Sequence, residues 1–221
     1  MDAEAWQEVM KPYYDYAGIT IYHGDAREVL PTLGKFDLLL TDPPYGIGEA
    51  SGKNKSRGKL ATPKDYGSHN WDNFPISEDL MTSIRHLCKK QIIFGGNYYD
   101  LPPTSCWLVW DKCNTGDFAD GELAWTNLKQ AVRIKRHLWN GLFRKGSEPR
   151  FHPTQKPLEV MAWALQQARD VKTVLDPFMG SGTTLRACKD AGIACVGIEQ
   201  QERYCEIAAQ RLSQEVMELG V

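Results

Sequence analysis

The chain has 221 residues, of which 42% are apolar and 24% are charged, and its formal net charge is −2. This composition suits one folded domain and excludes a disordered chain or a uniformly basic protein. No apolar run reaches the roughly 18 residues of a membrane span, and the acidic first residues lack the pattern of a secretory signal. We therefore expect a single domain over residues 1–221, soluble and cytoplasmic, with no membrane partner.

The alternation of short apolar runs with amphipathic segments predicts an α/β fold. Residues 19–22, 36–41, 91–95, 106–110, 132–138, 172–176 and 193–198 are predicted strands. Helices are predicted from Ser77 to Lys90, from Pro157 to about Arg169, from Thr183 to Ala191 and from Glu202 to Leu219. We expect a mostly parallel seven-stranded sheet with helices on both faces, and binding sites beyond the C-terminal ends of its strands.

The predicted strand 36–41 ends in the string TDPPYG, residues 41–46. Two consecutive prolines end the strand and stiffen the backbone. They hold the Asp42 carboxylate and the Tyr45 ring in a fixed relation just beyond a strand end. The candidate catalytic residues are therefore Asp42, Pro43, Pro44 and Tyr45.

Positive charge is concentrated in the middle of the chain, since residues 46–156 contain 17 Lys and Arg against 11 Asp and Glu. We interpret residues 46–70, rich in Gly, Ser and Asn, as a flexible loop that contacts a polyanion, and residues 112–156 as a basic recognition region. A solvated basic face without a partner is the alternative. The candidate contacts are Lys53, Lys55, Arg57, Lys59, Arg133, Lys135, Arg136, Arg144, Lys145 and Arg150.

The predicted strand 172–176 ends in the string DPFMGSGTT, residues 176–184, which leads into a helix. Its two glycines let the main chain approach a ligand closely, and the helix start offers free N–H groups. The string lacks the third glycine of a dinucleotide fingerprint and the Gly-Lys-Ser/Thr of a phosphate loop. Glu199 follows the next strand, where an acid can accept hydrogen bonds from a ribose diol, although a helix cap is the alternative reading.

Six cysteines are spread along the chain without a Cys-x-x-Cys pair, at Cys88, Cys106, Cys113, Cys188, Cys195 and Cys205. This spacing is not that of a zinc site or of a disulfide framework. We therefore expect no metal ion and interpret the cysteines as reduced, buried, small hydrophobic residues.

Together, TDPPYG and DPFMGSGTT resemble the amino-group DNA methyltransferases that use S-adenosylmethionine. Further matching strings are HGDA (23–26), IIFGGNYY (92–99), FADGELAWTN (118–127) and HPTQKP (152–157). The catalytic string precedes the glycine string, which resembles the circularly permuted order of the beta class. Small phage and prophage members look nearest, because no long target-recognition insert is present. The resemblance implies one Rossmann-like methyltransferase domain acting on double-stranded DNA.

In that family the target base leaves the DNA stack before it reacts. The resemblance implies that the Asp42 carboxylate and the Pro43 carbonyl accept the two hydrogens of the base amine, while the base stacks on Tyr45. No covalent nucleophile is needed, because the sulfonium of the cofactor is already an activated methyl donor. The basic contacts of residues 46–70 and 112–156 would then bind DNA phosphates.

The resemblance also implies a cofactor site. Glu199 would hold the ribose of S-adenosylmethionine, Asp25 would face its adenine, and Lys156 would lie near its methionine carboxylate. Asp25 is equally explained as a helix cap, and Lys156 as a phosphate contact or a surface lysine. The cofactor-binding set is Asp25, Asp42, Lys156, Asp176, Phe178, Gly180, Ser181, Gly182, Thr183, Glu199 and Gln200.

We predict adenine N6 as the target, because Asp at the first position of the catalytic string resembles adenine enzymes, whereas cytosine N4 enzymes of this class more often have Ser there. Cytosine N4 methylation, RNA methylation and a catalytically inactive DNA-binding module are alternatives. Ring-carbon cytosine methylation needs a thiolate, and no Pro-Cys occurs in the chain. The sequence does not determine the recognition site, a homodimer or a cognate restriction enzyme.

Overall fold

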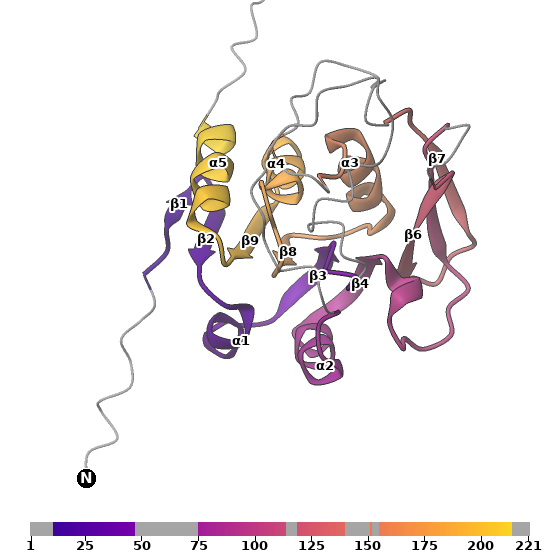
Figure 1. The fold of residues 1–221 in the computed structure, drawn as a ribbon, viewed down its shortest axis with the longest axis horizontal. Helices are drawn as coiled ribbons and strands as arrows, with labels where there is room; N and C mark the ends of the chain where they lie inside the picture. Colours follow the sequence, from indigo (N-terminus) through magenta and orange to yellow (C-terminus); the bar gives the residue numbers. More distant parts are fainter. Residues whose placement is uncertain (1–10, 47–74, 114–118, 140–150, 152–154, 214–221) are drawn as a thin grey trace, which may run out of the picture.

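The computed structural model describes residues 11–46, 75–113, 119–139, 151 and 155–213. Within these residues nine strands form one sheet in the order β1-β2-β9-β8-β3-β4-β6-β5-β7 (Figure 1). The strands are β1 (Tyr14–Tyr16), β2 (Ile19–His23), β3 (Phe36–Thr41), β4 (Cys88–Phe94), β5 (Trp107–Asp111), β6 (Gly121–Thr126), β7 (Arg133–Arg136), β8 (Thr173–Asp176) and β9 (Ala194–Glu199). The helices are α1 (Ala26–Val29), α2 (Glu78–His86), α3 (Leu158–Gln167), α4 (Thr183–Asp190) and α5 (Glu202–Ser213), with short 3-10 turns η1 (Leu30–Thr32) and η4 (Gly96–Tyr98).

Parallel pairing dominates the sheet, as predicted. The neighbours β2, β9, β8, β3 and β4 pair in parallel, and β5 pairs in parallel with β7. Only β1 and β6, among the described strands, pair antiparallel with their neighbours. The predicted number of seven strands is wrong, because these same two strands bring the sheet to nine.

The two unpredicted strands lack the apolar runs on which the prediction depended. β1 has three residues, none of them buried, so pairing with β2 rather than core packing defines it. β6 opens with Gly121 and Glu122, which are unfavourable in strands. Glu122 is tolerated there because lysine side chains pair with it, as described below.

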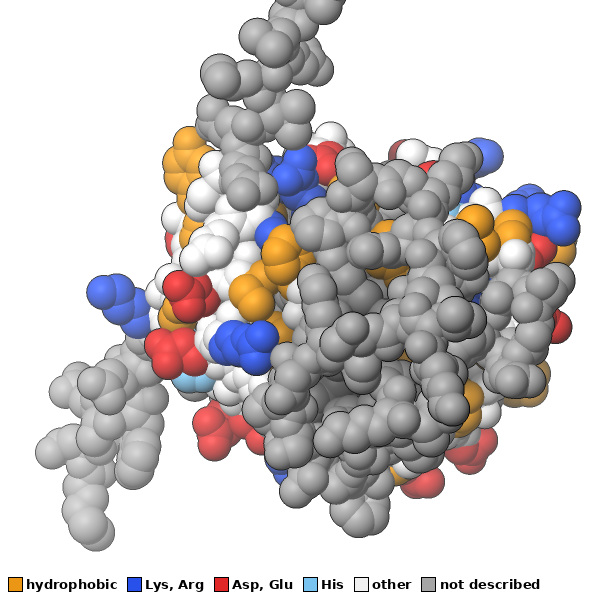
Figure 2. All heavy atoms as spheres, turned by 45° about the horizontal axis from the view of Figure 1, so that its top comes forward, with side chains coloured by type: hydrophobic (Ala, Val, Ile, Leu, Met, Phe, Trp, Pro, Cys, Tyr) orange, Lys and Arg blue, Asp and Glu red, His pale blue; other side chains and the backbone are white. Residues whose placement is uncertain are grey.

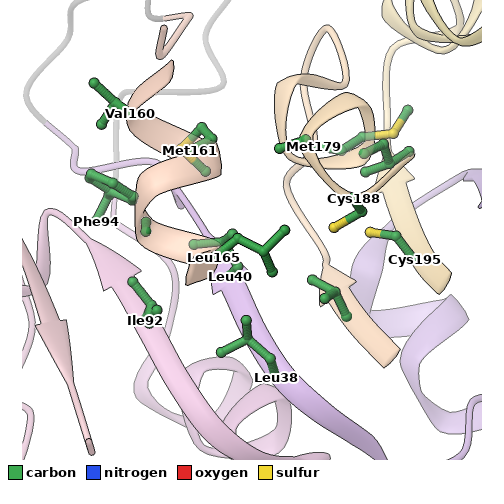
Figure 3. Close-up of a cluster of buried hydrophobic side chains, with 14 of the residues drawn as sticks. Leu38, Leu40, Ile92, Phe94, Val160, Met161, Leu165, Met179, Cys188 and Cys195 are labelled. Carbon is green, nitrogen blue, oxygen red and sulfur yellow. The ribbon is translucent and has the colours of Figure 1, made fainter. Parts of the chain in front are cut away.

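Helices cover both faces of the sheet, as expected. Figure 1 shows α3, α4 and α5 on one face and α1 and α2 on the other. Each face has its own cluster of buried apolar side chains. Figure 3 shows the first of these, in which Val160 and Leu165 of α3 lie over Leu38, Leu40 and Ile92 of the two central strands. This packing fixes α3 against β3 and β4.

Helix α2 ends earlier than predicted. Ser77 caps it as expected, accepting a hydrogen bond from the Leu80 N–H, but the helix ends at His86. Lys89 and Lys90, predicted to lie at its C-terminal end, belong to β4 instead. The chain changes from helix to strand within two residues because Cys88 already pairs with β3.

Five of the six cysteines are buried, and Cys188 and Cys195 face each other in the core (Figure 3). The prediction is wrong for Cys113, which is exposed in a turn after β5. Its N–H donates to the Asp111 carboxylate at 2.8 Å, and its backbone has a positive φ of 52°. No helix in the described part of the chain is long and apolar enough to cross a membrane.

Candidate active site

A cavity of about 440 Å³ lies beyond the C-terminal ends of β3, β8 and β9. Two segments far apart in the sequence meet there, the turn after β3 and the turn after β8. Residues of the predicted catalytic and cofactor sets that line it are Asp25, Asp42, Pro44, Lys156, Asp176, Phe178, Gly180, Ser181, Thr183, Glu199 and Gln200. Sequence reasoning did not foresee that residues 75–77 and Leu80, at the start of α2, complete the wall.

A second hollow, of about 770 Å³, lies elsewhere on the molecule and is lined by Arg85, Trp125, Lys129 and their neighbours. No Asp or Glu belongs to its lining. It therefore lacks the paired acids that make the first cavity a candidate for chemistry.

Asp42 is the central acid of the catalytic turn. Its Oδ1 accepts a hydrogen bond from the Tyr45 hydroxyl, and its Oδ2 lies 2.5 Å from the Lys156 ammonium. Burial raises the pKa of Asp42, although Lys156 opposes the rise. Both carboxylate oxygens are thus bound by groups of the chain itself.

Lys156 is buried, and two carboxylates bind its ammonium. Besides Asp42, Glu122 lies 3.0 Å away, and Glu122 in turn lies 2.6 Å from Lys112. Burial alone lowers the pKa of Lys156, but the two carboxylates raise it above its ordinary value. Burial alone raises the pKa of Glu122, yet the two lysines hold it at about 2. We call Asp42, Tyr45, Glu122 and Lys156 the acceptor half of the site.

Sequence reasoning missed Glu122 and Lys112, and placed Lys156 near a cofactor carboxylate. In the structure the ammonium of Lys156 contacts carboxylates of the chain, and the cofactor contact stays a prediction. One signal pointed to Glu122, since it stands in the matching string at residues 118–127 and is a charge inside a strand whose next residues are apolar.

Tyr45 is fixed by its surroundings. Its ring stacks on Tyr98 with centroids 4.9 Å apart and planes 15° apart, and its backbone forms an antiparallel bridge with Pro75. A Cβ on Gly95 would lie 2.0 Å from the Tyr45 ring, and Gly95 also has a positive φ of 64°. Only glycine fits this position. The residue that follows β4 therefore leaves the space that the Tyr45 ring occupies.

The turn after β8 is held by Asp176, which is buried and accepts hydrogen bonds from the Thr41 hydroxyl at 2.8 Å and the Phe178 N–H at 3.2 Å. Burial raises the pKa of Asp176 to about 6. Because Thr41 immediately precedes Asp42, this contact ties the turn after β8 to the catalytic turn.

Glu199, at the end of β9, accepts hydrogen bonds from the Gly180 N–H at 3.1 Å and the Gln201 N–H at 2.8 Å. Burial raises the pKa of Glu199 to about 7. We call residues 176–183 together with Glu199 the glycine half of the site. Gly182 does not line the cavity, because it packs against α5, where a Cβ would lie 2.7 Å from Ala208.

Asp25 caps α1 and also lines the cavity, and its contact with an adenine stays a prediction. It caps α1, accepting from the Arg27 N–H at 2.8 Å, and its Oδ2 lies 2.7 Å from the Arg27 guanidinium. The Gln200 side chain donates to the same carboxylate at 2.9 Å, and both Asp25 and Gln200 line the cavity. The hydrogen bonds of Arg27 lower the pKa of Asp25, so it faces the cavity as a carboxylate.

Three of the predicted DNA contacts lie on the edge strand β7, where Lys and Arg side chains gather (Figure 2). Lys135 pairs with Glu159 at 2.7 Å and Arg136 with Asp111 at 2.8 Å. Arg133 forms no ion pair with a described residue. The remaining predicted contacts, Lys53, Lys55, Arg57, Lys59, Arg144, Lys145 and Arg150, lie outside the described residues.

Comparison with known proteins shows which family the sequence matches. The family model N6_N4_Mtase, described as DNA methylase, matches residues 100–210, half of the chain. Type II methyltransferase M.ScaI of Streptomyces caespitosus is 25% identical over 95% of this chain and 86% of its own length. Type II methyltransferase M2.LlaDCHI of Lactococcus lactis subsp. cremoris is 24% identical over 92% of each.

Solved structures show the same fold. The M1.HpyAVI–SAM complex matches with a TM-score of 0.57 and 22% identity, covering 89% of this chain and 100% of that chain. The cytosine-N4-specific PvuII DNA methyltransferase matches with a TM-score of 0.61 and 14% identity, covering 95% and 91%. Since the family model spans half of the sequence, the chain belongs to the N6_N4_Mtase DNA methylases, the S-adenosylmethionine-dependent methyltransferases of base amino groups.

Proposed function

We propose that the protein transfers the methyl group of S-adenosylmethionine to the N6 amine of adenine in double-stranded DNA. One observation carries the proposal. Asp42 and Lys156 of the acceptor half line the same cavity as Asp176, Phe178 and Glu199 of the glycine half. A base amine held by the first half would therefore meet a methyl donor held by the second.

The acceptor half supplies hydrogen-bond acceptors for the amine. The exocyclic nitrogen of a base is a poor nucleophile, because its lone pair is delocalised into the ring. The Asp42 carboxylate and the Pro43 carbonyl would accept its two hydrogens and draw the nitrogen toward tetrahedral geometry. The protein then contributes placement and electrostatic stabilisation rather than a covalent intermediate.

The target base must leave the duplex to reach this cavity. Extrusion costs a few kcal/mol, which stacking on an aromatic ring offsets in part. Tyr45 is the proposed stacking ring. In the structure its ring stacks on Tyr98, which is 48% exposed, so a base that takes the place of Tyr98 would reach it from outside.

The glycine half fits an adenosyl cofactor by the chemistry of its groups. When bound, S-adenosylmethionine supplies an activated methyl group. Glu199 has acceptor capacity for ribose hydroxyls beyond its backbone N–H partners in the described part of the chain, and Asp25 with Gln200 would face the adenine. Asp176 pairs with hydroxyl and N–H donors and not with a described lysine or arginine, which suits a cationic ligand nearby. The other proposed contacts are Lys156, Phe178, Gly180, Ser181 and Thr183, whereas Gly182 shapes the turn from outside the cavity.

Adenine is proposed over cytosine because an Asp, Asp42, stands at the first position of the catalytic string. Mass spectrometry of nucleosides from duplex DNA treated with the protein and S-adenosylmethionine tests this choice. We expect N6-methyladenine. Detection of N4-methylcytosine without N6-methyladenine would refute the base assignment, and methylation of RNA but not of duplex DNA would refute the substrate.

Double-stranded DNA is the proposed partner of β7, through the exposed Arg133 above all, and of residues 46–70. Neutralising DNA phosphates releases counterions, so binding should weaken steeply as salt rises. A titration of duplex affinity between about 50 and 200 mM salt checks this expectation. A flat profile would remove the basic residues from the DNA interface.

A further inference from the structure

Four side chains of alternating charge extend from the sheet surface to the catalytic turn. Lys112 lies 2.6 Å from Glu122, Glu122 lies 3.0 Å from Lys156, and Lys156 lies 2.5 Å from Asp42. Lys156 has 6% of its side chain exposed, Lys112 and Glu122 have 19% and 24%. Of the four, only Asp42 belongs to the catalytic string, so the role of Glu122 needs its own explanation.

Glu122 is positioned by the antiparallel pair of β5 and β6. It stands opposite Trp110 in the register, and the Lys112 N–H donates to the Asp120 carbonyl at 2.9 Å just beyond the strand ends. The Lys112 ammonium also lies 4.9 Å from the centre of the Trp110 ring. Glu122 is therefore held by rigid sheet, whereas its partner Lys156 lies in the segment that leads into α3.

A second carboxylate changes what Lys156 does to Asp42. A buried ammonium with one carboxylate would give its charge and its strongest hydrogen bond to that group alone. Because Glu122 also binds the Lys156 ammonium, the interaction of that ammonium with Asp42 is weaker than it would be with Asp42 alone. The Asp42 carboxylate then keeps more of its capacity to accept hydrogen bonds from another donor.

We propose that Glu122 is a positioning residue for methyl transfer: by binding Lys156 as a second carboxylate, it keeps Asp42 a strong acceptor for the target amine. The inference rests on the proposed function, since it requires that Asp42 binds an amine. Glu122 acts through Lys156 and need not touch the substrate.

Electrostatics lead to the same conclusion. The amine nitrogen gains positive charge as it accepts the methyl group, so negative potential at Asp42 stabilises the transition state. An isolated Asp42–Lys156 pair is neutral, and Glu122 restores negative potential beside it. Lys112 offsets this less, because it lies on the far side of Glu122 and is partly in contact with solvent, which screens its charge.

The pH dependence of the reaction separates this role from simple structural support. The charged and titratable groups around Asp42 are Lys156, Tyr45, Glu122 and Asp176. The negative charge of Glu122 raises the pKa of Asp42. Removing that charge must therefore lower the pKa of Asp42 and move the acidic limb of the rate profile to lower pH.

The experiment compares Glu122→Gln with Glu206→Gln, a matched control on the exposed face of α5. The measurement is single-turnover methyl transfer to duplex DNA at saturating S-adenosylmethionine, from pH 4 to 9. We expect Glu122→Gln to slow transfer roughly tenfold to a hundredfold. Its acidic limb should shift to lower pH, and its cofactor affinity should stay within about twofold of wild type. Glu122→Asp should recover part of the rate, and Glu206→Gln should match wild type.

A second variant guards against loss of folding. Lys112→Met with Glu122→Gln removes one charge of each sign, so the buried charges stay balanced. It should bind cofactor normally and still transfer slowly. Wild-type rates in Glu122→Gln, or slow transfer with an unmoved acidic limb and no recovery in Glu122→Asp, would overturn the positioning role alone. A wild-type protein that methylates no DNA would overturn the proposed function as well.

Discussion

Glu122 and Glu199 are glutamates on strands of one sheet, yet the pKa of Glu122 is about 2 and that of Glu199 about 7. Burial disfavours the charged form of both. Glu122 has two lysines within 3.0 Å, whereas Glu199 has only backbone N–H partners among the contacts in the described residues. The two lysines thus compensate the burial of Glu122, whereas the burial of Asp176 and Glu199 in the glycine half is only partly compensated. A ligand that brings hydrogen-bond donors or positive charge would therefore stabilise the glycine half most.

The largest expected effect comes from Asp42→Ala, which removes an acceptor from the acceptor half and leaves the glycine half unchanged. Methyl transfer should fall by at least about a thousandfold, because the acceptor of the amine is removed. Cofactor affinity should stay within a few-fold, since the glycine half is untouched. Single-turnover rates and isothermal titration measure the two quantities. Normal turnover in this variant would defeat the role given to the acceptor half.

Gly95→Ala should disturb the acceptor half without changing its chemistry. The new Cβ would lie 2.0 Å from the Tyr45 ring, and the backbone φ of 64° is also unfavourable for alanine. Since small displacements of reacting groups are costly, we expect transfer to slow by up to about a hundredfold. A structure of the variant should show Tyr45 displaced from Tyr98. Gly192→Ala, at another glycine of positive φ but with open space around it, is the control.

Stability should depend on pH through Glu199 and Glu122 in opposite ways. Glu199 has a folded pKa of about 7, above its ordinary 4.5, so the cofactor-free protein should lose stability as pH rises from about 4.5 to 7. Glu122 has a folded pKa of about 2, so its contribution is present above 4.5 and lost as pH falls toward 2. Each effect is on the order of 1–3 kcal/mol.

Urea unfolding across this pH range, on wild type, Glu199→Gln and Glu122→Gln, checks these two windows. The first variant should flatten the decline between about pH 4.5 and 7, and the second the loss below about pH 4.5. Identical profiles for all three proteins would show that the two glutamates do not differ as the structure indicates.

Glu199→Gln should also weaken cofactor binding roughly tenfold, through weaker hydrogen bonds to the ribose hydroxyls. At saturating S-adenosylmethionine the transfer rate should return close to wild type, which is the reverse of the Asp42→Ala result. Titration calorimetry and saturation kinetics give both values. Unchanged cofactor affinity would remove Glu199 from the ribose site.

The smallest expected effects are on DNA affinity and come from basic residues that lie outside both halves of the site. Arg133→Ala should reduce the slope of log affinity against log salt by about one, as expected for one lost phosphate contact. Arg136→Ala should change it less, because Arg136 already pairs with Asp111 at 2.8 Å. Equal slopes for the two variants would show that the ion pair of Arg136 opens on DNA.

The sequence predicted those parts of the site that lie within short strings. Asp42 to Tyr45 and residues 176–183 were recognisable because prolines and glycines impose local turn geometry wherever they stand. Glu199 was found from its place after a strand. Their meeting in one cavity followed from the rule that parallel strands of such sheets end at the same edge.

What could not be predicted depends on pairings between distant residues. The strand β6 contains a charged residue that is stable there only because Lys112 and Lys156 bind it, so its apolar pattern was incomplete. The stacking of Tyr45 on Tyr98 depends equally on the glycine at the end of β4. The predicted number of seven strands was wrong for the same reason, since β1 and β6 form through pairing with their neighbouring strands.

The amino-acid sequence by itself determined the α/β fold class, the two turn motifs and the family, because these depend on residue types and spacing over a few residues. Only the tertiary structure decided which groups bind the buried charged side chains. Lys156 binds Asp42 and Glu122, whereas Asp176 and Glu199 accept hydrogen bonds from neutral donors among the described residues. Electrostatic interactions act through space over a few ångströms, and no spacing along the chain states those distances.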